Sequence, residues 1–247
     1  MRNIWTIAKR EYQNYFASPI AYVTAAGLLL FTGGYFAAIV YSSAAQAMFG
    51  GYAPDVIPII SLFAFLLIFI VPALTIRLLA DENRSGTIEL MLTAPVRDFE
   101  LVAGKWLGAY LFMLSIIAVT LIYPIILNNL VQPGIDQVVM TTAYLGIILL
   151  AGAFLAIGTG ISAMFSNQVA AFFVTMITLV LLWWLMGFPA SYVQTGGDIF
   201  RYLDMQSHFY NSLGAGKINV TDLVYFFSLI AVGLFTGTMA VETRRWR

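Results

Sequence analysis

The sequence predicts an all-helical integral membrane protein with six transmembrane helices. Of its 247 residues, 61% are hydrophobic and only 10% are charged, whereas soluble domains carry about a quarter charged residues. The hydrophobic residues gather in uncharged runs long enough to cross a bilayer, and most basic residues lie between these runs. No segment alternates with the two-residue period of a barrel strand, and lipid offers the backbone no hydrogen-bond partner, so helices are expected.

Long runs without charge define the six spans, since a helix needs about 20 apolar residues to cross the hydrocarbon core. Between Asp136 and Asp198 lie 61 uncharged residues, enough for two crossings, and the polar cluster Phe165–Gln168 is the predicted break. Residues 1–247 are expected to form a single transmembrane domain. Its predicted spans are residues 20–41, 56–79, 104–131, 138–164, 168–188 and 222–241.

Basic residues predict that both termini face the cytoplasm. With the N-terminus inside, only Arg201 and Lys217 among the twelve Lys and Arg residues fall outside. Cytoplasmic loops carry an excess of Lys and Arg, so this distribution indicates the orientation. The ten residues on the inner side are Arg2, Lys9, Arg10, Arg77, Arg84, Arg97, Lys105, Arg244, Arg245 and Arg247.

The N-terminal segment, residues 1–18, is predicted to be an amphipathic helix at the membrane interface. Its apolar residues recur at helical spacing opposite a basic and polar face. Such a helix lies along the inner membrane surface before the chain enters the first span.

The cytoplasmic loop at residues 80–103 concentrates the charge of this chain. Between Asp81 and Glu100 it carries seven of the 24 charged side chains. Each would cost about 2.5–3.5 kcal/mol in lipid, so the loop is expected in the cytosol. Ser85 can cap a short helix that Pro95 ends. The pattern alone fits an ordinary charged loop as well as a stiff projection that docks on a cytosolic partner.

Two motifs resemble one family of transport proteins. The run RSGTIELMLTAPVRDFELVAGKWLGAY, Arg84–Tyr110, resembles the signature of ABC-2-type permeases, the membrane subunits of a class of ABC transporters. The run REYQNYFASPIAY, Arg10–Tyr22, resembles the entry to the first span in the branch with the gliding-motility-associated permease and the nitrous-oxide-reductase maturation permease. Span count and loop placement extend the resemblance over the whole chain.

The resemblance implies a permease subunit of an ATP-driven exporter in the prokaryotic cytoplasmic (inner) membrane. In the family this loop carries a coupling helix, which docks on a cytosolic ABC ATPase present in two copies. ATP and Mg²⁺ would be bound by that ATPase, and no cofactor by this chain. The expected partners are the ATPase, a second permease copy or a homologous permease, membrane lipids and an outer accessory protein.

The resemblance also assigns residues to ATPase coupling. They are Arg84, Ser85, Gly86, Thr87, Ile88, Glu89, Leu92, Pro95 and Arg97. Glu89 would pair with a basic ATPase residue, and Ile88 and Leu92 would fill an apolar notch. Arg10 and Glu11 of the N-terminal helix are secondary contact candidates.

One position departs from the family pattern at the start of the third span. The family often has Ser or Thr where this chain has Arg97, and that residue forms a capping box with the Glu three positions on. With no such box expected here, Asp98 is the predicted cap.

The sequence carries no recognisable nucleotide or catalytic site. The only Gly-Lys pairs begin at Gly104 and Gly216, and neither has the earlier glycine and the following Ser or Thr of a phosphate-binding loop. His208 is the single histidine, which excludes H-E-x-x-H zinc sites, and it is predicted to be an ordinary outer-loop residue. The chain has no cysteine, and its zero net charge does not indicate a nucleic-acid partner. It is therefore not expected to be an enzyme.

Two other functions share part of the pattern. A secondary transporter would need ionisable residues at mid-membrane depth, and charges within the predicted spans are nearly absent. A non-transporting mechanotransmission scaffold, which uses ATP to act on an outer partner, would carry the same coupling loop.

The outer loop, residues 189–221, is aromatic rather than polar. Short re-entrant helices before the last span, as in ABC-2 permeases, and a plain interfacial loop fit it equally well. If the helices gate an exit, Phe200, Tyr202 and Phe209 are the gate candidates. Phe172 and Phe173 of the fifth span are candidates for lining the translocation path. Four residues at helical spacing could form a polar face for an outer partner: Asp198, Arg201, Asp204 and His208.

Small residues at four-residue spacing mark helix contacts in two spans. Gly152, Ala156 and Gly160 form one set, because small residues let helix backbones approach closely in lipid. The second set, in the first span, is Gly27, Gly33, Gly34, Ala37 and Ala38. Packing within one subunit is favoured over a dimer seam for both. Pro58, Pro72 and Pro124 predict kinks.

Overall fold

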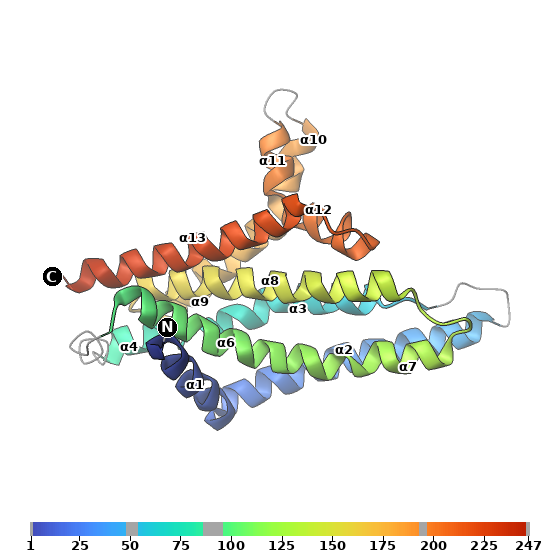
Figure 1. The fold of residues 1–247 in the computed structure, drawn as a ribbon, viewed down its shortest axis with the longest axis horizontal. Helices are drawn as coiled ribbons and strands as arrows, with labels where there is room; N and C mark the ends of the chain where they lie inside the picture. The colour runs from blue at the N-terminus through green and yellow to red at the C-terminus, as the bar shows by residue number, and fades with distance from the viewer. Residues whose placement is uncertain (1, 48–53, 86–95, 193–196, 246–247) are drawn as a thin grey trace.

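The computed structural model describes residues 2–47, 54–85, 96–192 and 197–245, and all regular structure in these ranges is helical. Six helical segments are long and apolar enough to cross a membrane. They run side by side, and both termini lie at the same end of the bundle (Figure 1). The prediction of an all-helical membrane protein with six spans is confirmed. The six segments are Pro19–Ala45, Ile57–Glu82, Asp98–Leu130, Gln137–Met164, Gln168–Pro189 and Val220–Arg244.

The described helices follow one another along the chain in two halves. The first half comprises α1 (Arg2–Ala17), α2 (Pro19–Ala47), α3 (Ile57–Thr75), α4 (Ala80–Ser85), α6 (Asp98–Thr120) and α7 (Ile122–Leu130). The second half comprises α8 (Gln137–Met164), α9 (Gln168–Val180), the π-helical η1 (Leu181–Leu185), α10 (Gly187–Tyr192), α11 (Gly197–Leu203), α12 (Met205–Tyr210), the 3-10 helix η2 (Leu213–Ala215) and α13 (Val220–Arg245).

The turn between α8 and α9 coincides with the predicted break. α8 ends at Met164, and α9 begins at Gln168. The Asn167 side chain accepts hydrogen bonds from the backbone N–H groups of Val169, at 2.9 Å, and Ala170, at 3.4 Å. This amide caps the first turn of α9, where backbone N–H groups have no partner within the helix.

The third span is interrupted near Pro124, one of the three prolines at which a kink is predicted. α6 ends at Thr120 and α7 begins at Ile122. Proline has no N–H, so Pro124 cannot bond the carbonyl four residues earlier, that of Thr120. The Tyr144 hydroxyl on α8 donates to that carbonyl at 2.9 Å. A neighbouring helix thus satisfies the acceptor that the proline leaves open.

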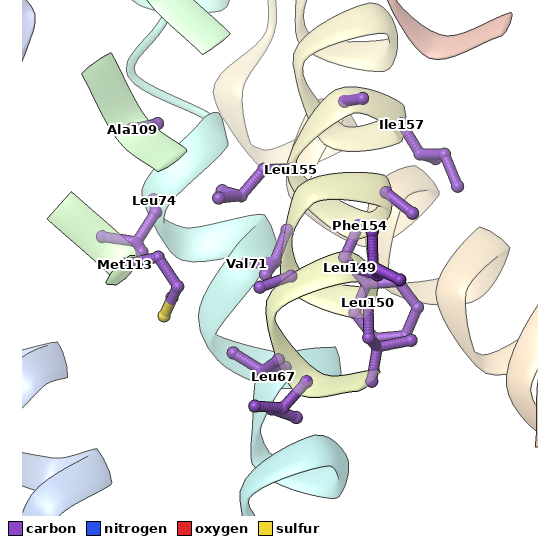
Figure 2. Packing of buried hydrophobic residues seen from close by; sticks show 14 of the residues in the cluster. Leu67, Val71, Leu74, Ala109, Met113, Leu149, Leu150, Phe154, Leu155 and Ile157 are labelled. Carbon is purple, nitrogen blue, oxygen red and sulfur yellow. The ribbon is translucent and has the colours of Figure 1, made fainter. Parts of the chain in front are cut away.

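Helix α8 is the centre of the bundle. Two-thirds of its membrane-crossing window, 67%, is buried by other parts of the chain. A Cβ added at Gly160 would lie 2.5 Å from the carbonyl oxygen of Gly233 on α13, and one added at Gly158 would lie 2.6 Å from Thr75 Oγ1 on α3. Glycine is therefore required for these close approaches. Figure 2 shows the apolar side chains of α3, α6 and α8 that meet around this centre.

The first and fifth spans lie at the periphery of the chain. Only 11% of the α2 window and 22% of the α9 window is buried. A Cβ at Gly27 or Gly34 would meet nothing within 4 Å, whereas one at Gly33 would lie 3.1 Å from the Tyr123 hydroxyl. Packing within the subunit therefore explains the glycine at position 160, as predicted. Of the three α2 glycines, it explains only Gly33.

Candidate coupling site

The two ends of the predicted coupling segment lie at the end of the bundle that carries both termini (Figure 1). Arg84 and Ser85 belong to the last turn of α4, and Arg97 immediately precedes α6. The other assigned residues lie outside the described residues: Gly86, Thr87, Ile88, Glu89, Leu92 and Pro95. The described surroundings of the segment therefore define the site.

The start of α6 differs from the prediction. Arg97, not Asp98, is the N-cap residue, and Glu100 accepts a hydrogen bond from the Arg97 backbone N–H at 3.2 Å. A capping glutamate at the third helical position thus works without a Ser or Thr at the cap. The same Glu100 oxygen accepts from Asn3 Nδ2 of α1 at 3.0 Å, so α1 is fixed to the first turn of α6.

A buried lysine joins three helices, two of which flank the coupling segment in the chain. Lys105 of α6 is 1% exposed, and its Nζ lies 3.1 Å from Glu11 Oε1 of α1 and 2.7 Å from Glu82 Oε1 of α4. Arg10 also lies 3.3 Å from Glu11 Oε1. Two cations and two carboxylates therefore balance in charge. We call these four residues the Lys105 cluster.

The Lys105 cluster changes the interpretation of Glu11. The sequence made Glu11 a contact candidate for the ATPase, but its side chain is buried and points to Lys105. A buried carboxylate is retained only with a partner, because the cost of desolvation is large. Glu11 therefore acts inside the chain, whereas Arg10 remains exposed at 55% of its side chain.

Close packing holds α1 against α6 beside this cluster. A Cβ at Gly104 would lie 2.8 Å from Ile7 Cβ, and one at Gly108 would lie 2.6 Å from Glu11 Cβ. The Tyr15 ring stacks on Phe112 at 4.9 Å, and its hydroxyl donates to the Leu74 carbonyl of α3 at 3.0 Å. Burial raises the pKa of the Tyr15 hydroxyl well above its usual value, so this donor keeps its proton.

The residues that lead into the coupling segment are also attached to α8. Ser162 Oγ accepts from the backbone N–H groups of Leu79, at 3.3 Å, and Ala80, at 3.0 Å. Gln168 of α9 donates to the carboxylate of Asp81. A cleft of about 230 Å³ remains between α1 and the end of α3, with Arg77 and Asp81 in its lining.

The other assigned aromatic residues lie on three helices, and Phe172 and Phe173 contact each other edge to face with ring centroids 5.4 Å apart. On α9, Phe172 is half-buried and Phe173 is 50% exposed. On α11, Phe200 is half-buried and Tyr202 is exposed, but Phe209 on α12 is 1% exposed and packs on Trp183. In this conformation Phe209 belongs to the protein core.

His208 is not an ordinary loop residue. It is buried, its Nδ1 lies 2.6 Å from Asp222 Oδ1, and its Nε2 lies 2.8 Å from the Tyr202 carbonyl oxygen. Both ring nitrogens are therefore within hydrogen-bond distance of oxygen atoms. The ring also stacks on Tyr225 at 4.2 Å. His208 therefore attaches α12 to the start of α13.

A polar cleft of about 670 Å³ adjoins His208 and is lined by residues that precede and begin α13. Arg201, Asp204 and His208, three of the four residues predicted to form a polar face, line it together. Burial raises the pKa of the Asp204 carboxyl, and hydrogen bonds from the Gln206 and Ser207 backbone act in the opposite direction. In the described part of the chain, no three His, Cys, Asp or Glu side chains gather as metal ligands would.

These features define a class of protein: a polytopic helical membrane subunit with a charged, helix-bridging site at one end of its bundle. The sequence profile of the family described as ABC-2 family transporter protein matches residues 5–242. The chain therefore belongs to this family and is a transporter permease subunit. A comparison with curated proteins found no significant match.

Proposed function

We propose that this permease is an exporter subunit driven by two copies of a separate cytosolic ABC ATPase, which docks on residues 84–97. In this proposal the ATPase binds ATP and Mg²⁺, and the permease pairs with a second copy or a homologous permease. Both permease termini face the cytoplasm of a prokaryotic cell, as the distribution of Lys and Arg indicates.

The Lys105 cluster is the observation that supports this coupling. Two of its three helices flank the proposed docking segment in the chain, because α4 leads into it and α6 follows it, and α1 packs on α6 and contacts Lys105 through Glu11. Because Lys105 is buried between two carboxylates, separating α4 from α6 would expose unpaired charges in a poorly hydrated site. A displacement of the docking segment is therefore passed to α1 and α6 together.

Charge reversal in the docking segment tests the proposal. The tagged permease is purified in mild detergent from its native host, and the co-purifying ATPase is identified by mass spectrometry and ATP hydrolysis. Like charges placed together at an interface cost several kcal/mol, so Glu89→Arg is expected to lower ATPase recovery about tenfold or more. Asp55→Arg, an exposed carboxylate at the other end of the bundle, is the matched control and is expected to leave recovery unchanged.

Two results would contradict the proposal. One is that no ATP-hydrolysing chain accompanies the wild-type permease. The other is that Glu89→Arg and Asp55→Arg recover the ATPase equally well.

Mechanotransmission is the second candidate function, and one cavity favours it. The space enclosed by α2, α3, α6, α7 and α8 next to Tyr144 amounts to about 10 Å³, room for one water at most. Cargo cannot pass through this space in the present conformation, whereas transport requires a path through the permease or between its subunits. A mechanotransmission scaffold needs no such path. Uptake assays in proteoliposomes that contain the permease and the ATPase separate transport from mechanotransmission. ATP-dependent movement of cargo supports transport. ATP hydrolysis that moves only the outer helices supports the scaffold.

A further inference from the structure

We propose that the groove between α1 and α6 is a binding site for one anionic phospholipid, with its phosphate at Lys9 and an acyl chain along α6. The groove has a volume of about 630 Å³, within the usual range for ligand sites. Trp5, Lys9, Tyr12 and Gln13 of α1 and Leu111, Leu114, Ser115 and Ala118 of α6 line it.

The groove exists because α1 crosses α6 obliquely (Figure 1). The two helices touch tightly at Gly104 and Gly108, where a Cβ would collide with α1. Leu111 and Ala118 lie about 5 and 15 Å further along α6, at about 1.5 Å per residue. α6 begins at the end of the bundle with the termini, so the groove runs from the membrane surface towards the membrane interior.

The α6 wall of the groove suits an acyl chain. It consists of Leu111, Leu114 and Ala118, and its one polar side chain, Ser115, is hydrogen-bonded to the Tyr12 hydroxyl at 3.0 Å. The wall therefore offers an apolar surface whose polar group is already satisfied. Covering it with hydrocarbon carries no penalty for an unpaired donor or acceptor.

The α1 edge of the groove suits an anionic headgroup. Lys9 is exposed and makes no ion pair with any described residue, whereas its neighbour Arg10 contacts Glu11. No carboxylate lines the groove. Trp5, 58% exposed, lies beside Lys9; tryptophan is enriched at the headgroup level of membranes, and a lysine there extends its ammonium to the phosphates.

Charge and shape together favour a lipid over a protein occupant. A second permease copy or the ATPase would have to supply both an acidic group for Lys9 and an apolar ridge for Leu111 and Leu114. One phospholipid supplies a phosphate and a hydrocarbon chain at the required separation, and the protein is surrounded by phospholipid in the membrane.

Native mass spectrometry of the purified full-length permease tests this site. The protein in detergent receives equal amounts of a phosphatidylglycerol and a phosphatidylcholine with the same acyl chains. Wild type is expected to retain the anionic lipid preferentially. Lys9→Gln is expected to reduce that preference about fivefold, the equivalent of one lysine beside anionic lipid. Lys217→Gln, an exposed lysine outside the groove, is the matched control and is expected to keep the preference.

A second variant tests the acyl-chain half of the site. Ala118→Trp places a bulky side chain in the groove and is expected to abolish retention of one lipid of either kind; retention equal to wild type overturns the groove as the site. Equal preference in wild type, Lys9→Gln and Lys217→Gln overturns the role of Lys9. If Lys9→Gln lowers ATPase recovery and leaves lipid retention unchanged, the groove is a protein contact and the lipid proposal fails.

Discussion

Lys105 is a buried charge that two carboxylates stabilise. Burying an ammonium group is unfavourable unless partners surround it, and here Glu11 and Glu82 do so at hydrogen-bond distance. Three apolar residues of similar size would pack at lower cost. The ion pairs of Lys105 with Glu11 and Glu82 connect α1, α4 and α6, as the coupling proposal requires.

Removal of the lysine tests the importance of this arrangement. Lys105→Met is expected to lower the free energy of unfolding by about 3–5 kcal/mol, because two buried carboxylates lose their shared partner. Thermal unfolding in detergent provides the measurement. Lys217→Met, at an exposed site, is the control and is expected to change stability by less than about 0.5 kcal/mol. The triple variant Lys105→Met, Glu11→Gln, Glu82→Gln is expected to recover most of the loss, and no recovery would contradict the ion-pair explanation.

At the scale of the elements, glycine placement distinguishes tightly packed helices from loosely packed ones. Gly160 of α8 lies where its backbone touches α13, whereas Gly27 of α2 faces open space. Both belong to sets of small residues with helical spacing, so the pattern in the sequence is the same for each. The contact around α8 is internal to the chain, and the surface of α2 remains uncovered.

A matched pair of substitutions separates these two roles. Gly160→Leu is expected to cost at least about 1–3 kcal/mol, because its side chain would overlap the Gly233 backbone and force α13 away. Gly27→Leu is expected to leave the fold of the single chain intact. Thermal unfolding and resistance to proteolysis in detergent measure both. Equal destabilisation by the two substitutions would contradict the packing described here.

The span pattern was predictable, and the contacts between spans were not. Each residue of a span must be compatible with lipid, so the spans appear in the sequence as long uncharged runs. The turn at Asn167 appears as a polar break between two such runs. The Lys105 cluster joins residues 94 and 23 positions apart, and only the folded chain brings them together. Its signal in the sequence was a lysine at the start of an apolar span, which indicates that a partner is needed. His208 gave no comparable signal, because Asp222 is one of several acidic residues near the outer loop.

At the scale of the whole molecule, the absence of cysteine makes orientation directly measurable. With a cytoplasmic N-terminus, Thr87→Cys lies inside the cell and Ile218→Cys lies outside. A membrane-impermeant maleimide is expected to label Ile218→Cys in intact cells and Thr87→Cys only after permeabilisation. The reverse pattern would contradict both the orientation and the coupling proposal.

The uneven burial of the spans has a mechanical consequence. α8 packs against α3 at Gly158 and against α13 at Gly160, and neither contact has room for a methyl group. In contrast, most of the surface of α2 and α9 is not covered by other parts of the chain. In the coupling proposal, a displacement passed to α1 and α6 would then also move the less buried α2 and α9 and leave α8 as the stationary axis. Spin labels on α8 and α13 should then report a constant separation throughout a nucleotide cycle, and labels on α2 and α8 a changing one.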